Sequence, residues 1–274
     1  MAKSHSSTRK TLSYLFSLLI AIFLSIFVVL TVTRFTIMSP NYILKQMNKA
    51  DFYEQSIIAL NEEIQQETQS TGFPIEMFEN YLSTDEYKVI IESHMKDAFD
   101  NGTTEIDTTQ FEQKLDQDIN QYIKDNNILI NTDSQNAIAL MKTNLVELYK
   151  SYITFPYVSI VYQVIDTYQS LYLIAAAILV VLIIIASVLL YRLYSHYKGR
   201  RRYFAYAISS SGLMCLVLPG VLYFGKFVNK INLSPAYFYD FFTNMFNSYL
   251  LIYVIIGFIM IVLANIFAYI KFKR

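Results

Sequence analysis

Residues Ile174–Leu190 have the sequence IAAAILVVLIIIASVLL, in which Ser187 is the only polar residue. A helix of about 20 apolar residues is long enough to cross the hydrocarbon core of a bilayer. With its immediate flanks, this run covers residues 170–191. The sequence therefore predicts a transmembrane helix over that range.

Three further stretches meet the same criterion, at residues 12–33, 203–224 and 249–270. The stretch 203–224 is the least apolar of them, because it contains the polar and small cluster Ser209–Gly212 and also Pro219. Residues 12–33 are expected to form an uncleaved anchor. Their apolar core is longer than the roughly 7–15 residues of a signal peptide, and no small-residue cleavage motif follows them.

The overall composition agrees with a membrane protein. Of 274 residues, 54% are hydrophobic and only 16% are charged, whereas soluble domains have about 25% charged residues. The single cysteine, Cys215, lies in an apolar run and is interpreted as a small hydrophobic residue. One cysteine cannot form an internal disulfide, so any domain outside the membrane must fold without one.

Charged residues are segregated along the chain. Residues 1–11, 192–202 and 271–274 contain eleven Lys and Arg and no acidic residue. Such basic segments are typical of the cytoplasmic side of a membrane. The sequence therefore predicts a multi-pass plasma-membrane protein with both termini in the cytoplasm. Residues 34–169 and the loop 225–248 would then lie outside the cell.

The predicted outer segment 34–169 is strongly acidic and has a helical pattern. Between Ser39 and Tyr168 there are 21 Asp and Glu against eight Lys, which leaves a net charge of −13. Apolar residues recur there at the spacing of amphipathic helices. Four stripes show this spacing: Phe52, Tyr53, Ile57, Leu60 and Ile64; Tyr87, Ile90, Ile91, His94 and Phe99; Phe111, Leu115, Ile119, Tyr122 and Ile123; and Ile138, Met141, Leu145, Leu148 and Tyr149.

Helix-start and helix-stop signals frame these stripes. Ser83 with Glu86, and Asp107 with Gln110, resemble capping boxes, and Gly72 is expected to end a helix. Taken together, the patterns predict an all-α membrane protein. It would have four transmembrane helices and a helical extracellular domain inserted between the first and the second.

The sequence offers no catalytic constellation, so we expect a protein that is not an enzyme and has no cofactor or metal site. None of the common hydrolase, nucleotide-binding or paired-cysteine motifs occurs. His94 is expected to be a half-buried bundle residue. A local concentration of carboxylates is the weak candidate for an interaction face, and it comprises Glu112, Asp116, Asp118 and Asp125.

A basic cluster precedes the third predicted span and comprises Lys198, Arg200, Arg201 and Arg202. It is expected to fix the topology and to contact anionic lipid headgroups. No domain-sized basic surface suggests a nucleic acid as a partner. The cluster Ser209–Gly212 favours close helix packing, either within one chain or in a homo-oligomer.

Several short motifs occur in a fixed order around these segments, namely Pro40-Asn41-Tyr42, Gly72-Phe73-Pro74, Pro156-Tyr157, Arg202-Tyr203 and Asn232-Leu233-Ser234-Pro235. This arrangement resembles uncharacterised four-span integral membrane proteins of low-GC Gram-positive bacteria. The resemblance implies a plasma-membrane location and no particular activity. The order of the spans alone is also similar to the permeases of mechanotransmitting ABC systems.

Three functional hypotheses follow. The first is a non-enzymatic plasma-membrane protein whose acidic helical ectodomain binds a protein partner in the envelope or outside the cell. The alternative is a transport-linked membrane subunit, either an ABC-type permease or a small oligomeric channel. The third is protection against cationic peptides by the acidic outer face. Against a proton-coupled carrier, the cores of the predicted spans contain no Asp, Glu, Lys, Arg or His.

Overall fold

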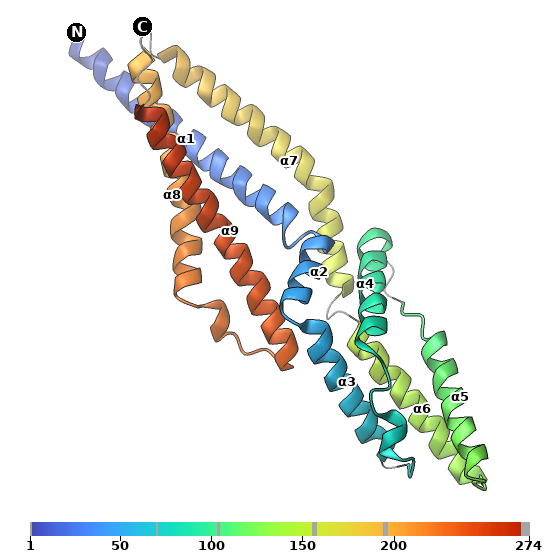
Figure 1. The fold of residues 1–274 in the computed structure, drawn as a ribbon. Helices are drawn as coiled ribbons and strands as arrows, with labels where there is room; N and C mark the ends of the chain where they lie inside the picture. The colour runs from blue at the N-terminus through green and yellow to red at the C-terminus, as the bar shows by residue number, and fades with distance from the viewer. Residues whose placement is uncertain (1, 70, 103–104, 155–157, 194–196, 270–274) are drawn as a thin grey trace. The chain divides into compact units, whose positions relative to one another are not determined.

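The computed structural model describes residues 2–69, 71–102, 105–154, 158–193 and 197–269, and every regular element within them is helical (Figure 1). The all-α prediction is therefore confirmed. The chain divides into two compact units. We call Met1–Gln46 together with Asp166–Arg274 the apolar unit, and Met47–Ile165 the acidic unit.

Four long helices dominate the apolar unit: α1 (Ala2–Phe35), α7 (Val158–Leu193), α8 (Tyr197–Phe224) and α9 (Ala236–Tyr269). Four helices in the described part of the chain are long and apolar enough to cross a membrane, and these are the four. The stretch in α8 has the lowest mean hydropathy, as predicted. The structure thus agrees with a multi-pass membrane protein.

One boundary differs clearly from the expectation. Residues 225–248 were predicted to be a loop, but α9 already begins at Ala236, after the short 3₁₀ helix η2 (Val228–Lys230). The reason is a row of aromatic side chains one helical turn apart. The ring centroids of Phe238 and Phe242 are 6.5 Å apart, and those of Phe242 and Phe246 are 4.5 Å apart. Such pairs stabilise helix beyond the apolar run itself.

The direction of the four helices alternates along the chain. The Ser17 hydroxyl of α1 donates to the carbonyl of Tyr203 in α8 (2.8 Å), and Ser25 lies 3.5 Å from Met214, so α1 and α8 run in the same direction. The Tyr168 hydroxyl at the start of α7 donates to the carbonyl of Leu30 near the end of α1 (2.6 Å), so α7 runs the opposite way.

The pairing of α8 with α9 completes this order. The Arg201 guanidinium of α8 donates to the carbonyl of Phe267 near the end of α9. The starts of α1 and α8 and the ends of α7 and α9 therefore share one end of the unit. Arg9 and Arg192 lie at that same end, whereas the basic residues 271–274 fall outside the described part of the chain.

The apolar unit is held together by small residues and by hydroxyl groups. Ile20, Ala186, Leu190, Tyr203 and Ala207 form a buried cluster that joins α1, α7 and α8. Gly212 of α8 and Gly257 of α9 face each other so closely that a Cβ atom on Gly257 would lie 2.6 Å from the Gly212 carbonyl oxygen. The predicted small-residue packing is thus used within the chain.

Towards the opposite end of the unit, hydroxyl groups of α1 and α9 form hydrogen bonds with one another. Thr33 of α1 lies 3.0 Å from the Tyr249 hydroxyl and 3.3 Å from the Tyr253 hydroxyl of α9. Tyr253 donates to the Val29 carbonyl (3.2 Å). Polar groups in an apolar environment are costly unless they are paired, so these contacts fix α9 against α1.

In chain order the acidic unit follows α1 and ends at Ile165, within the first part of α7. After α2 (Pro40–Lys49), whose last residues belong to it, it contains α3 (Phe52–Gln69), η1 (Ile75–Phe78), α4 (Thr84–Asn101), α5 (Thr109–Asp125) and α6 (Thr132–Ile153). Its core contains most residues of the predicted stripes together with others, such as Phe78 and Met95, that belong to none of them. All five residues of the α3 stripe are buried, as are Phe111, Leu115 and Ile119 of α5 and Met141, Leu145 and Tyr149 of α6. The rings of Phe111 and Tyr149 stack at 4.2 Å and join α5 to α6.

The two predicted capping boxes have different outcomes. Ser83 and Glu86 form a complete capping box at the start of α4, as expected. The prediction for Asp107 and Gln110 is wrong, since α5 starts one residue later, after Thr108. Asp107 instead accepts a hydrogen bond from the backbone N–H of Thr109 (2.9 Å), a local turn that competes with the capping geometry.

Candidate functional site

The four carboxylates predicted as one interaction face do not lie together. On α5, Glu112 and Asp116 are four residues apart and share one side, where they line a surface depression facing α6. Asp118 and Asp125 are seven residues apart and line a second depression, facing the segment that follows η1. The helical period separates the two pairs, so the predicted single face is wrong.

The Glu112–Asp116 side is occupied by contacts within the unit. Lys142 of α6 forms an ion pair with Asp116 (2.5 Å). The Thr108 hydroxyl donates to Glu112 (2.5 Å). This depression also contains Lys150, so positive and negative charges are mixed on it. The arrangement is typical of a solvated helix pair.

The Asp118–Asp125 side has three carboxylates, as does the Glu112–Asp116 side with Glu147, but it has one lysine instead of two. The Tyr81 hydroxyl donates to Asp118 (3.0 Å), and burial together with the nearby carboxylate raises the pKa of Tyr81 above its ordinary value. Lys114 donates to the Tyr81 carbonyl (2.6 Å) and lies over the Tyr81 ring. Asp125 and Glu79 complete the lining, so three carboxylates and one lysine face this depression.

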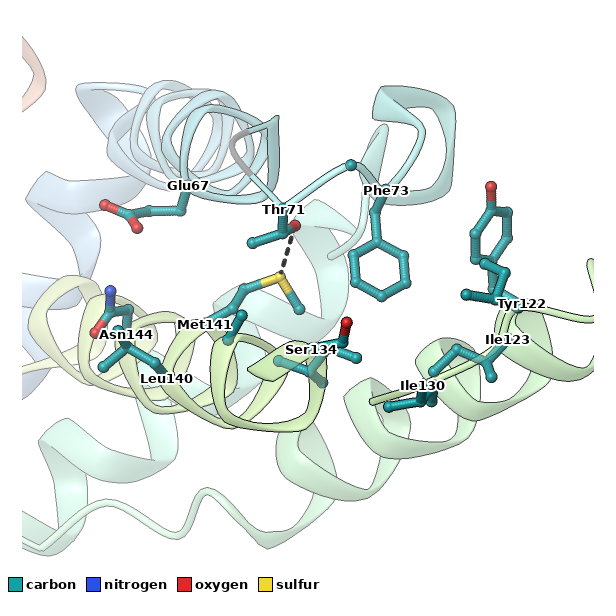
Figure 2. Close-up of a pocket in the computed structure, with 14 residues that line it drawn as sticks. Glu67, Thr71, Phe73, Tyr122, Ile123, Ile130, Ser134, Leu140, Met141 and Asn144 are labelled. Atoms are coloured by element: carbon teal, nitrogen blue, oxygen red, sulfur yellow. Dashed lines mark hydrogen bonds between the residues drawn. The ribbon is translucent and has the colours of Figure 1, made fainter. Parts of the chain in front are cut away.

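An apolar groove lies directly beside this depression, between the end of α3, the end of α5 and the start of α6 (Figure 2). Its volume is about 460 Å³. Figure 2 shows that Phe73, Met141 and Ile130 point into it. Tyr122 lines both the groove and the carboxylate depression. The lining residues are Glu67, Thr71, Gly72, Phe73, Tyr122, Ile123, Ile128, Ile130, Ser134, Ala137, Ile138, Leu140, Met141 and Asn144.

Contacts among the lining residues fix the shape of the groove. The Thr71 hydroxyl donates to the Thr68 carbonyl (2.6 Å) and lies 3.2 Å from the Met141 sulfur, a contact that ties the segment after α3 to α6. Gly72 has φ of +80°, a conformation that glycine adopts readily and that turns Phe73 inward. The Phe73 ring lies 5.6 Å from that of Tyr122. These contacts fix the wall of the groove.

The rim of the groove exposes apolar side chains to solvent. Leu140 of α6, which lines the groove, is 64% exposed. Ile128 and Ile130, which also line it, are exposed as well. Leu129 between them is 96% exposed but is not among the residues that line the groove. Exposed apolar side chains that gather around a depression commonly mark an interaction site.

In the basic cluster, the described side chains contact aromatic residues. Arg200 lies 3.7 Å from the centroid of the Tyr191 ring, and Arg202 donates to the Tyr206 hydroxyl (2.5 Å). Arg201 contacts both the backbone and the ring of Phe267. Lys198 lies in α8, but its side chain is outside the described atoms. Arg200 and Arg201 thus connect the start of α8 to the ends of α7 and α9, whereas the Arg202 contact lies within α8.

His94 is buried, and its Nε2 atom has no hydrogen-bond partner in the described part of the chain. Burial lowers the pKa of His94, against a smaller opposing effect of Asp97. Cys215 is buried in α8. Among the residues that the structure describes, no group of three or more His, Cys, Asp and Glu is placed to hold a metal ion.

Sequence reasoning missed the groove. Several of its residues, such as Tyr122, Ile123 and Ile138, belong to the predicted stripes and were taken as core. The available signal was the apolar triplet Ile128–Ile130 between two asparagines, where a solvated turn would be polar. Comparison with known proteins adds nothing to this geometry, since no family model, curated protein or solved structure matches the chain.

Proposed function

We propose that this chain is a non-enzymatic plasma-membrane protein whose acidic unit lies outside the cell and binds a protein partner of the envelope or the extracellular space. The observation that carries the proposal is the apolar groove with its exposed rim on a folded, acidic unit. A unit that served only to connect two spans would have no need of exposed leucines, which cost solubility.

The outside location is supported by charge. Basic residues gather at the end of the apolar unit where α1 and α8 begin, which fits the cytoplasmic side. Along the chain, the acidic unit is connected to the other end, since it follows the end of α1 and ends within the first part of α7.

Thiol labelling in intact cells tests this location. In a Cys215→Ser background, Asn120→Cys on exposed α5 should react with a membrane-impermeant maleimide. Lys10→Cys should react only after the cells are permeabilised. The reverse pattern would place the acidic unit in the cytoplasm and overturn the proposal.

Partner binding is tested by photo-crosslinking in cells. A photoreactive amino acid is placed in the full-length chain at Leu140, at Gln113 or at Val89, three exposed positions on different helices of the acidic unit. A position in the apolar unit, such as Lys10, serves as the control. We expect a reproducible protein adduct from the acidic unit. Adducts from none of its positions, together with a copurifying ATPase, would favour the transport-linked alternative.

A further inference from the structure

We infer that the apolar groove of the acidic unit binds a cationic amphipathic helix of a peptide or protein, whose apolar side chains enter the groove while its basic side chains face the carboxylates beside it. The inference rests on the proposed function and names the chemistry of the partner. It joins two observations that are independent of each other, namely the shape and lining of the groove and the charge around it.

The lining of the groove is suited to apolar side chains of a partner. Most of the lining side chains are apolar or aromatic, and the floor contains Met141 and Phe73, which are buried. Methionine adapts to side chains of different shape. An amphipathic helix places apolar residues on one face at intervals of three and four, which is how such helices occupy apolar grooves. The exposed Ile128, Ile130 and Leu140 would then be covered by the partner.

The charge selects a cationic partner. Glu67 is the only charged residue among those that line the groove. Across Tyr122, the adjoining depression contributes Glu79, Asp118 and Asp125 against the single Lys114. The acidic unit has 20 Asp and Glu and seven Lys, hence a net charge of −13. A field of this sign attracts basic segments and accelerates their association.

The same charge disfavours two other occupants. A second copy of the chain would bring another acidic unit with the same net charge into contact, and like charges oppose such an interface. An anionic lipid surface would be repelled in the same way. A cationic helix is the occupant that gains from both the groove and its surroundings.

The test uses the full-length protein in nanodiscs of zwitterionic phosphatidylcholine, with empty nanodiscs as the blank. The probe is a fluorescent peptide about five helical turns long, with leucines on one face and lysines on the other. One comparison peptide replaces lysine by glutamate, and another replaces leucine by serine. Binding is measured by fluorescence anisotropy above the blank.

Matched variants locate the binding site. Leu140→Ser combined with Ile130→Ser removes two rim side chains and should weaken binding of the leucine–lysine peptide about tenfold or more, as expected for lost apolar burial. Val89→Ser removes an apolar side chain that is 68% exposed on α4, away from the groove, and should leave binding unchanged. Glu67→Gln with Asp125→Asn should weaken binding and reduce its salt dependence.

Several outcomes would overturn the inference. They are equal binding of the glutamate peptide, equal effects of the groove and Val89 variants, and binding no greater than that to empty nanodiscs. Self-association of the protein, or flotation with anionic vesicles, that the Leu140 variant abolishes would assign the groove to another occupant. If in-cell adducts form from Gln113 or Val89 but not from Leu140, the inference fails while the proposed function stands. If no position of the acidic unit gives an adduct, the proposed function fails as well.

Discussion

The closest approach between α8 and α9 depends on two glycines, so adding one methyl group there should open the helix pair. A Cβ atom on Gly257 would lie 2.6 Å from the Gly212 carbonyl oxygen, 2.8 Å from Leu216 Cβ and 2.9 Å from Leu216 N. Two of these three neighbours are backbone atoms, which cannot rotate away. The variant Gly257→Ala must therefore move one helix relative to the other.

The size of this movement sets the size of the effect. Ordinary van der Waals contact begins at 3.4 Å, so the crossing must widen by about 0.8 Å at its tightest point. A gap of about 0.5–1 Å already loses a quarter to a half of the dispersion energy of each contact. Overpacking of this kind costs about 1–3 kcal/mol. The population of an opened helix pair should accordingly rise about 5- to 150-fold.

The native Cys215 reports this opening without any engineered label. It is the only cysteine of the chain, it lies three residues after Gly212, and it is 3% exposed. We expect Gly257→Ala in detergent micelles to raise the rate of maleimide labelling by the factor given above. Gly220→Ala is the matched control, because the nearest atom to its added Cβ is Val254 Cγ2 at 3.9 Å.

The double variant adds a second test of the same geometry. Gly212→Ala alone should also accelerate labelling, since its Cβ would lie 2.8 Å from the Gly257 carbonyl oxygen. One displacement relieves both clashes, so the two substitutions together should cost less than the sum of their separate effects. Labelling rates that are equal for Gly257→Ala and Gly220→Ala would refute the argument from the close crossing.

Three predictions concern the acidic unit within the full-length chain, with hydrogen exchange of its helices as the measurement. Because burial lowers the pKa of His94, the unfolded chain binds the proton more readily. Stability should therefore be full above the ordinary histidine pKa of 6.5 and should fall as the pH decreases below it; His94→Leu should flatten this dependence. Asn61→Leu should destabilise the unit by about 1–3 kcal/mol. The substitution removes a buried amide side chain that accepts a hydrogen bond from the Leu82 N–H (3.3 Å) and donates one to the Leu82 carbonyl (3.2 Å). An unchanged rate of hydrogen exchange at the Leu82 N–H would contradict the prediction for Asn61→Leu. Ser83→Ala should cost about 0.5–2 kcal/mol through loss of the α4 cap, whereas Ser93→Ala, on the exposed face of α4, should have a much smaller effect.

The sequence predicted those parts of the fold that rest on strong periodic signals. The run Ile174–Leu190 lies within α7, and the stripe from Phe52 to Ile64 is buried along α3. Long apolar runs and amphipathic stripes are reliable because burial of each residue contributes in the same direction. The start of α9 was missed because the aromatic residues before Tyr249 are interrupted by Asp240 and Asn244, which lower the apolar signal without interrupting the helix.

The candidate site was harder to predict, because it depends on where helices diverge. An apolar residue on a helical stripe is buried where a neighbouring helix packs over it. Where the neighbouring helix ends before that position, the same kind of residue lines a groove. Ile119 and Tyr122 belong to the same α5 stripe, yet Ile119 is fully buried while Tyr122 faces the groove. Nothing in the local pattern distinguishes these two positions. Their difference arises from the turn at Gly72 and the end of α3, which are far away in the sequence.

The net negative charge of the acidic unit and its apolar groove have to be considered together. An exposed groove residue such as Leu140 favours association with any apolar surface, including another copy of the same chain. A net charge of −13 opposes contact between copies and with anionic lipid, but it favours contact with a basic helix. In the inferred complex, the apolar rim would supply binding energy, and the carboxylates around it would determine which partners can use that energy. Neutralising the carboxylates should accordingly lower selectivity first, by admitting self-association, before it abolishes binding through the groove.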